Sequence, residues 1–167
     1  NIPDTYKEIV QKKTIQQKDF ELGKIKFDDK ILHRSRVIRY YLGESDQKRT
    51  QKDFNKVYKK IYKNKKYFFS AKDLALIESL SADGFNIPKG FKSEEISKEY
   101  SVPSNLLKLA ENNQAAFLAL KIAEIIGEDE AYDLDPETIY FITHLLNKTN
   151  LRKLRNEILI SALPQRS

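Results

Sequence analysis

The spacing of apolar residues is the strongest constraint on this chain, because they recur every three or four positions with little strict alternation. Side chains three and four residues apart share a helix face, whereas strand side chains change sides at every residue. The composition agrees, since 18 Leu and 17 Ile stand against only four Val and six Thr, and Val and Thr favour strands. The 167 residues therefore predict an all-α protein.

Capping residues and helix breakers divide the chain into a predicted bundle of about seven to nine helices. The helices expected before residue 100 are 4–16, 28–42, 45–66, 71–83 and one or two turns within 93–99. The helix 45–66 has one apolar stripe, made of Phe54, Val57, Tyr58, Ile61 and Tyr62. Ser70 and Asp73 resemble a shortened capping box before the next helix.

The last 64 residues predict two stacked helical hairpins, an arrangement like that of an α-solenoid. Their helices are expected at 104–112, 115–126, 136–148 and 151–163. Asp135 followed by Pro136 marks a helix start, as an N-cap and a proline in the first turn. A shift of 37 positions places Leu109 on Leu146, a period typical of helical repeats. A true repeat and a chance match of helical phase both stay open.

Charge is distributed unevenly along the chain. Residues 48–72 hold 10 basic side chains and one acidic side chain, whereas residues 73–167 hold 10 basic and 15 acidic ones. The first segment alone exceeds the net charge of +6 of the whole chain. We therefore expect a basic helical segment at 1–70 and a helical-hairpin region at 71–167, packed as one continuous unit.

A resemblance rests on part of this pattern. The residues concerned are Ala82-Asp83-Gly84, Pro103, the run from Leu134 to Tyr140 and the run from Leu151 to Arg166. Residues 104–163 resemble the units of tetratricopeptide-type α-solenoids, although the usual Trp, Gly and Ala positions are not met. The last 90 or so residues are similar to uncharacterised helical proteins of alphaproteobacteria. The resemblance implies a scaffold fold, no known catalytic residue and an undefined partner.

Lysines stand beside aromatic residues in the segment 48–69. The candidate binding residues there are Lys52, Lys56, Lys59, Lys60, Lys63, Lys65 and Lys66. Three interpretations stay open: solvated lysines on an ordinary amphipathic helix, a site for an acidic protein surface or peptide, or a site for nucleic acid or an anionic membrane. Because lysine outnumbers arginine, nucleic-acid binding would be nonspecific and salt-sensitive.

A second basic cluster opens the last expected helix. Arg152 and Arg155 are candidate binding residues there, with Lys153 between them. Cations at a helix start slightly oppose the helix dipole. They form either a face that binds carboxylates or ordinary ion pairs with Glu157 and nearby acids.

Sequence patterns for catalysis and metal binding are lacking. Without Cys, the chain has no disulfide, zinc thiolate or cysteine nucleophile. His33 and His144 lie 111 positions apart, and the apolar neighbours of His144 predict a hydrogen-bonded core or boundary residue. The acidic segment 128–135 lacks the ligand register of an EF-hand. Nucleophile and phosphate-loop motifs are also missing. We therefore expect no catalytic residues, metal or cofactor.

The sequence thus favours a noncatalytic protein-interaction or scaffold module. Its expected partner is another protein with an acidic surface or peptide, and the opposite charges of its two parts also suit self-association. One alternative is a nonspecific nucleic-acid-binding module that uses residues 48–69. Another is the noncatalytic superhelical part of a larger cell-envelope enzyme, since the chain lacks an initiator Met. With no apolar run near 20 residues, we expect a soluble protein of the bacterial cytoplasm or periplasm.

Overall fold

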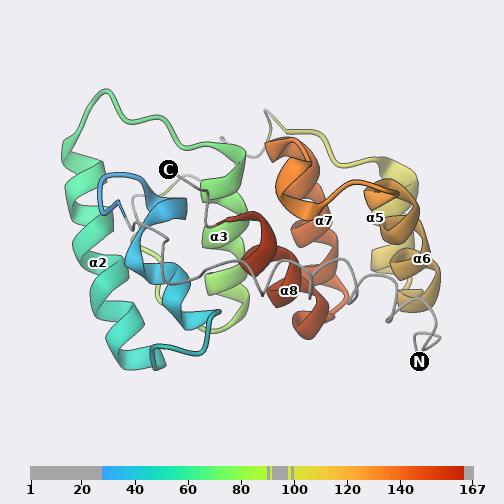
Figure 1. Cartoon of the computed structure of the whole chain (residues 1–167), viewed down its shortest axis with the longest axis horizontal. Coiled ribbons are helices and arrows are strands. Elements are labelled where there is room, and N and C mark those ends of the chain that lie inside the picture. Colours follow the sequence, from blue (N-terminus) through green and yellow to red (C-terminus); the bar gives the residue numbers. More distant parts are fainter. Residues whose placement is uncertain (1–27, 90, 92–97, 99, 164–167) are drawn as a thin grey trace.

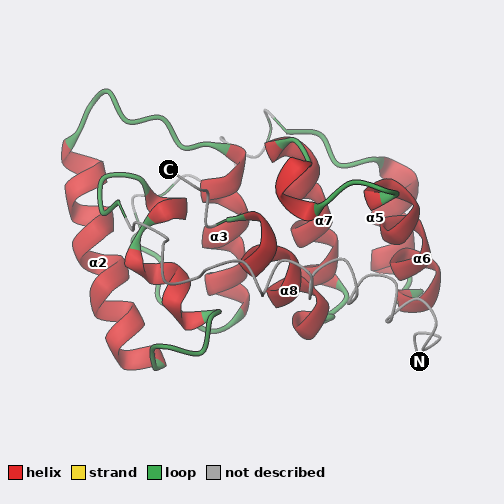
Figure 2. Cartoon of the chain, viewed as in Figure 1, coloured by secondary structure: helices red, strands yellow, loops and turns green. Residues whose placement is uncertain are grey.

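A computed structural model describes residues 28–89, 91, 98 and 100–163. Within them it has six α-helices, three 3₁₀-helices and no strand, which confirms the all-α prediction (Figure 2). The elements are η2 (Leu32–Arg34), η3 (Arg36–Tyr40), α2 (Gln47–Lys63), α3 (Ala71–Ala82), α5 (Ser104–Glu111), α6 (Ala115–Ile126), η4 (Ala131–Asp133), α7 (Pro136–Lys148) and α8 (Arg152–Ala162). The predicted helix 4–16 lies outside the described residues, as does most of 93–99, so the total of seven to nine helices stays a prediction.

Helix α3 lies in the middle of the molecule (Figure 1). Helix α2 forms one end of the long axis, with η2 and η3 between it and α3. On the other side α3 packs against α7, which in turn packs against α8 and α5. Helices α5 and α6 form the opposite end. The paired packing of α5 with α6 and of α7 with α8 matches the two predicted hairpins, whereas their solenoid arrangement stays a prediction.

The sequence of α3 explains its central place. Nine of its 12 residues are buried, namely Ala71, Lys72, Asp73, Leu74, Ala75, Leu76, Ile77, Ser79 and Leu80. A helix that is apolar around its whole circumference must be covered on every side. One hydrophobic cluster accordingly runs from Leu32 to Leu163, and the expected boundary near residue 70 falls inside it.

Two helix starts have the caps that the sequence predicted, whereas the helix expected at 45–66 runs from Gln47 to Lys63 with Asp46 as its N-cap. The Ser70 side chain accepts a hydrogen bond from the amide of Asp73, and the Asp73 side chain accepts one from the amide of Ser70, which completes a capping box. Asp135 accepts hydrogen bonds from the amide and hydroxyl of Thr138, at 2.9 and 2.7 Å, with Pro136 in the first turn of α7. These side chains satisfy amides that have no partner inside the helix.

The expected single helix over 28–42 is wrong. Ser35 is extended, with φ −80° and ψ 173°, and separates the two short 3₁₀-helices η2 and η3. Its side chain accepts a hydrogen bond from the amide of Val37. This bond replaces one that a continuous helix would make with the same backbone amide. The break allows Leu32 on one side, and Val37 and Ile38 on the other, to reach full burial.

Ile61 tests whether α2 belongs to the common core. Only 2% of Ile61 is exposed, so Ile61→Asp buries an uncompensated carboxylate and should lower the free energy of unfolding by more than about 4 kcal/mol. Tyr62→Asp, one residue away at 67% exposure, is the matched control and should cost about 1 kcal/mol or less. Chemical denaturation measures both free energies of unfolding. Equal losses for the two variants would mean that the apolar side of α2 is not part of the core.

Candidate interaction surface

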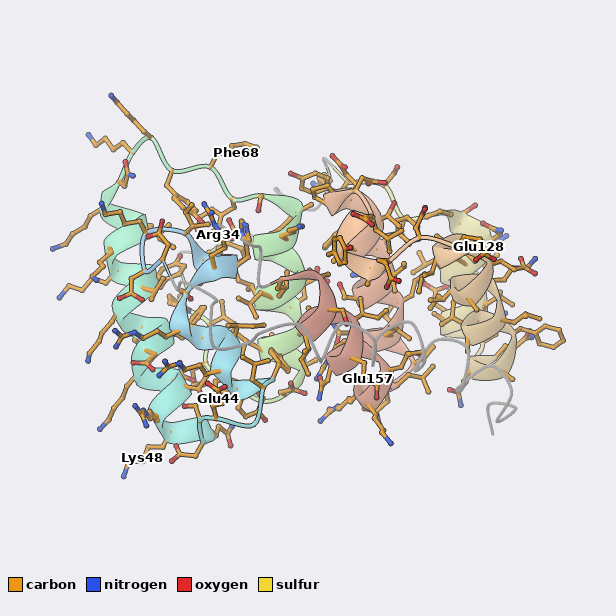
Figure 3. All side chains as sticks on the ribbon, in the orientation of Figure 1. Arg34, Glu44, Lys48, Phe68, Glu128 and Glu157 are labelled. Atoms are coloured by element: carbon orange, nitrogen blue, oxygen red, sulfur yellow. The ribbon has the colours of Figure 1, made fainter. Side chains whose placement is uncertain are left out.

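One row of lysines follows the outer face of α2. The row is Lys48, Lys52, Lys56, Lys59 and Lys63, at spacings of four, four, three and four residues, and all five are exposed. At about 100° per residue, this row points away from the buried row of the same helix. The buried residues of α2 are Thr50, Phe54, Val57, Tyr58 and Ile61. Figure 3 shows long side chains projecting from α2 at this end of the molecule, with Lys48 labelled.

This row, called the lysine face below, carries little compensating negative charge. At about 1.5 Å per residue it extends for about 22 Å. Lys60 lies on its flank and forms an exposed ion pair with Asp29, at 3.7 Å. Within the part of the chain that the structure describes, no ion pair joins the five lysines of the face to a carboxylate. Asp53 is the acidic residue of α2, and it is half-buried.

Two further predicted lysines continue the basic surface beyond the helix. Lys65 and Lys66 are exposed in the turn that follows α2. Seven of the nine predicted binding residues thus lie on α2 or directly after it. Lys72, the last cation of the basic segment, is buried and donates to the carbonyl of Ala162, so it does not contribute to this surface.

Two aromatic side chains of the basic segment 48–72 are exposed, Tyr62 on α2 and Phe68 in the connection to α3. The exposed fraction is 67% for Tyr62 and 68% for Phe68. The sequence placed Tyr62 in the buried stripe, and that placement is wrong, because only one side of the ring stacks on Tyr58, at a centroid distance of 6.0 Å. Phe68 was not identified from the sequence. The sequence offered one indication that Phe68 is exposed. It lies in the short connection between the lysine-rich turn and the cap Ser70, and a short connection has few buried positions.

Arg155, a predicted binding residue, belongs to the core. Its side chain is 1% exposed and donates to both carboxylate oxygens of Asp83, at 2.8 and 2.7 Å. It also donates to the side chain of Asn147 and lies over the Tyr41 ring. Arg152 is 53% exposed and lies 3.8 Å from Asp83. The guanidinium of Arg155 is therefore used within the protein, which removes it from any binding surface.

Both histidines of the chain bind carboxylates of α3. Nδ1 of His144 lies 2.8 Å from Glu78, so the prediction of a hydrogen-bonded boundary residue is confirmed. Nδ1 of His33 lies 2.6 Å from Asp73 and 3.4 Å from Oγ of Ser70. A catalytic triad needs the acid on one ring nitrogen and the nucleophile on the other. Here both groups approach the same nitrogen, so this cluster caps a helix and does not activate a nucleophile.

The electrostatics of Asp73 reflect its position at the start of α3. Burial raises the pKa of its carboxyl, but hydrogen bonds from His33, from the Tyr67 hydroxyl at 2.7 Å and from the Ser70 amide lower it more. The net result is a pKa below the ordinary value of 3.8. The folded state therefore holds Asp73 as a charged, fully bonded group.

Comparisons with known proteins add no assignment: no protein-family model matches the chain, and neither a curated protein nor a solved structure matches it significantly. Among the described residues, no three His, Asp or Glu side chains gather in a way that could hold a metal ion. In the same part of the chain, every helix is too short or too polar to span a membrane. The charged surface is thus the feature from which function has to be argued.

Removing the Arg155 side chain should strongly lower the free energy of unfolding. Arg155→Ala removes the buried ion-pair partner of the Asp83 carboxylate, which is 8% exposed, and leaves it with the longer ion pair to Arg152, at 3.8 Å. We expect a loss of about 3–5 kcal/mol in the free energy of unfolding. Lys153→Ala, at an exposed position of the same helix, should change it by less than about 0.5 kcal/mol. Urea denaturation distinguishes the two variants, and a small loss for Arg155→Ala would show that the buried pair is dispensable.

Asp73 should make stability depend on acid pH. Its pKa is lower in the folded state, so the unfolded state binds more protons as the pH falls. The Asp73 contribution is fully present above about pH 4 and is lost as the pH falls through the lowered folded-state pKa. In Asp73→Asn, stability should be lower at pH 7 and should decline less between pH 5 and pH 2. A series of thermal melts across this range measures it, and parallel curves would contradict the role of Asp73.

Proposed function

We propose that this chain is a noncatalytic interaction module whose lysine face binds an acidic surface of another protein. The observation that carries the proposal is the row of five exposed lysines, which no carboxylate of the described residues neutralises. The packing of α2 on η2 and η3, with η2 against α3, supports the scaffold part of the proposal, since it presents the lysine face on a fixed helix.

The spacing of the lysines favours a helical or extended acidic partner. Residues three or four positions apart on a helix lie about 6 Å apart, so carboxylates at the same spacing on a partner helix would match the row. A lysine ammonium is a mobile point charge that needs no fixed approach direction. Exposed pairs of this kind contribute about 0.2–1 kcal/mol each, so several must act together.

A second candidate function is nonspecific binding of single-stranded nucleic acid. The specific observation is the exposure of Tyr62 and Phe68 beside Lys63 and Lys65. Stacking of a base on such a ring contributes about 1–3 kcal/mol, and the lysines would supply phosphate contacts. An acidic peptide gains little from the rings, so the two ligand classes respond differently to loss of the aromatic side chains.

The binding test uses a labelled polyglutamate peptide at about 50 mM salt. The variant Lys52→Glu, Lys56→Glu, Lys59→Glu and Lys63→Glu should weaken binding by at least about 30-fold, since four exposed charges are reversed. The control variant reverses four exposed lysines elsewhere, namely Lys89, Lys108, Lys148 and Lys153. It has the same net charge and should keep the parent affinity. Fluorescence anisotropy measures this, and equal losses, or no binding by the parent, would refute the proposal.

The same titration with a labelled oligothymidine separates the second candidate from the first. Tyr62→Ala with Phe68→Ala should weaken oligothymidine binding by tenfold or more if the bases stack on these rings. The affinity for polyglutamate should stay the same. Loss of both affinities would point to a change in the fold, which circular dichroism would reveal.

A further inference from the structure

The lysine face and the most acidic segment of the chain lie on opposite sides of α3. Residues 122–147 hold seven carboxylates and no Lys or Arg, and they comprise the end of α6, the connection through η4 and most of α7. Helices α2 and α6 lie at opposite ends of the long axis (Figure 1). The labelled residues Lys48 and Glu128 accordingly lie on opposite sides of the molecule (Figure 3).

Some of these carboxylates already have a partner inside the protein. Glu124 binds Lys121, at 3.0 Å, and Asp135 caps α7. Four others are exposed and form the group called the acidic end below. They are Glu128, Asp129, Asp133 and Glu137.

Exposed aromatic side chains follow the same division. Of the four large hydrophobic residues that are exposed among the described residues, Tyr62 and Phe68 belong to the basic segment 48–72. The other two are Phe117 on α6, at 63% exposure, and Tyr132 within η4, at 49%. Tyr62 lies on α2 itself and Tyr132 precedes Asp133 in η4, so each charged group has one partly exposed ring next to it in the chain, and burial of such rings is favourable.

We infer that the acidic partner of the lysine face is the acidic end of a second copy of this chain. The inference rests on the proposed function and names its partner. Four exposed carboxylates stand against five exposed lysines, so the two surfaces complement each other in sign and nearly in number. Contact between them would also bring together the exposed aromatic residues of the two ends.

The position of the two surfaces sets the type of assembly. Because different surfaces meet, the contact is heterologous, and a pair of copies keeps one unused lysine face and one unused acidic end. Copies therefore add head to tail along the long axis and do not close into a twofold dimer. Contacts between exposed charges are screened at about 10 Å in 0.1 M salt, so the assembly grows at low salt and dissociates at high salt.

Sedimentation velocity of the whole 167-residue chain tests this. At about 20 mM salt, the weight-average mass should rise with protein concentration to twice the monomer value or more, and it should return to the monomer value at about 500 mM salt. The face variant reverses Lys52, Lys56, Lys59 and Lys63 to Glu. The end variant reverses Glu128, Asp129, Asp133 and Glu137 to Lys. Each variant alone should stay monomeric at low salt, because its two surfaces carry the same sign.

An equimolar mixture of the two variants should associate, because each surface then meets one of opposite sign. The control with Lys89, Lys108, Lys148 and Lys153 reversed keeps both surfaces and should associate like the parent. A parent that is monomeric at every concentration and at low salt overturns the inference. So does an end variant that associates as the parent does.

The polyglutamate titration separates this inference from the proposed function. The end variant keeps its lysine face and should bind polyglutamate at least as tightly as the parent. A monomeric parent that binds polyglutamate refutes the second-copy partner and leaves the interaction module standing. A monomeric parent that does not bind polyglutamate refutes both.

Discussion

Burial of α3 on every side is the constraint on which the rest of the structure depends. Its apolar residues need cover from two directions: η2, packed in turn against η3 and α2, supplies it on one side, and α7 supplies it on the other. Three carboxylates along the helix then hold the neighbours in place. Asp73 binds His33, Glu78 binds His144, and Asp83 at the C-cap binds Arg155. Each carboxylate has a partner, since an unpaired charge at a buried or partly buried position would lower the stability of the fold.

This arrangement places the titratable groups of the interior in structural contacts and leaves the lysines of α2 on its outer face. Both histidines and Arg155 are bound within the protein, and Ser70 caps α3. Helix α2 needs only one of its sides for packing, so lysines fill the other without disturbing the core.

Much of the fold could be predicted from local signals. The capping pair Ser70–Asp73 and the sequence Asp135-Pro136 act within four residues, and the helices they begin were predicted correctly. The helix expected at 28–42 was wrong, because the burial of residues on both sides of Ser35 outweighed helical spacing. Of the candidate site, the lysines were predicted to be solvent-facing, since apolar spacing on the same helix leaves them no other side.

By itself the sequence determined the helical class, the main helix ends and the uneven charge, because these depend on spacing and capping over a few residues. Tertiary structure alone decided that Arg155 turns inward while Lys56 stays outside, and that Tyr62 remains exposed. It also decided that the basic and acidic segments lie on opposite sides of α3. Such outcomes depend on which elements pack against α3, and contacts between residues 70 or more positions apart leave no local pattern in the sequence.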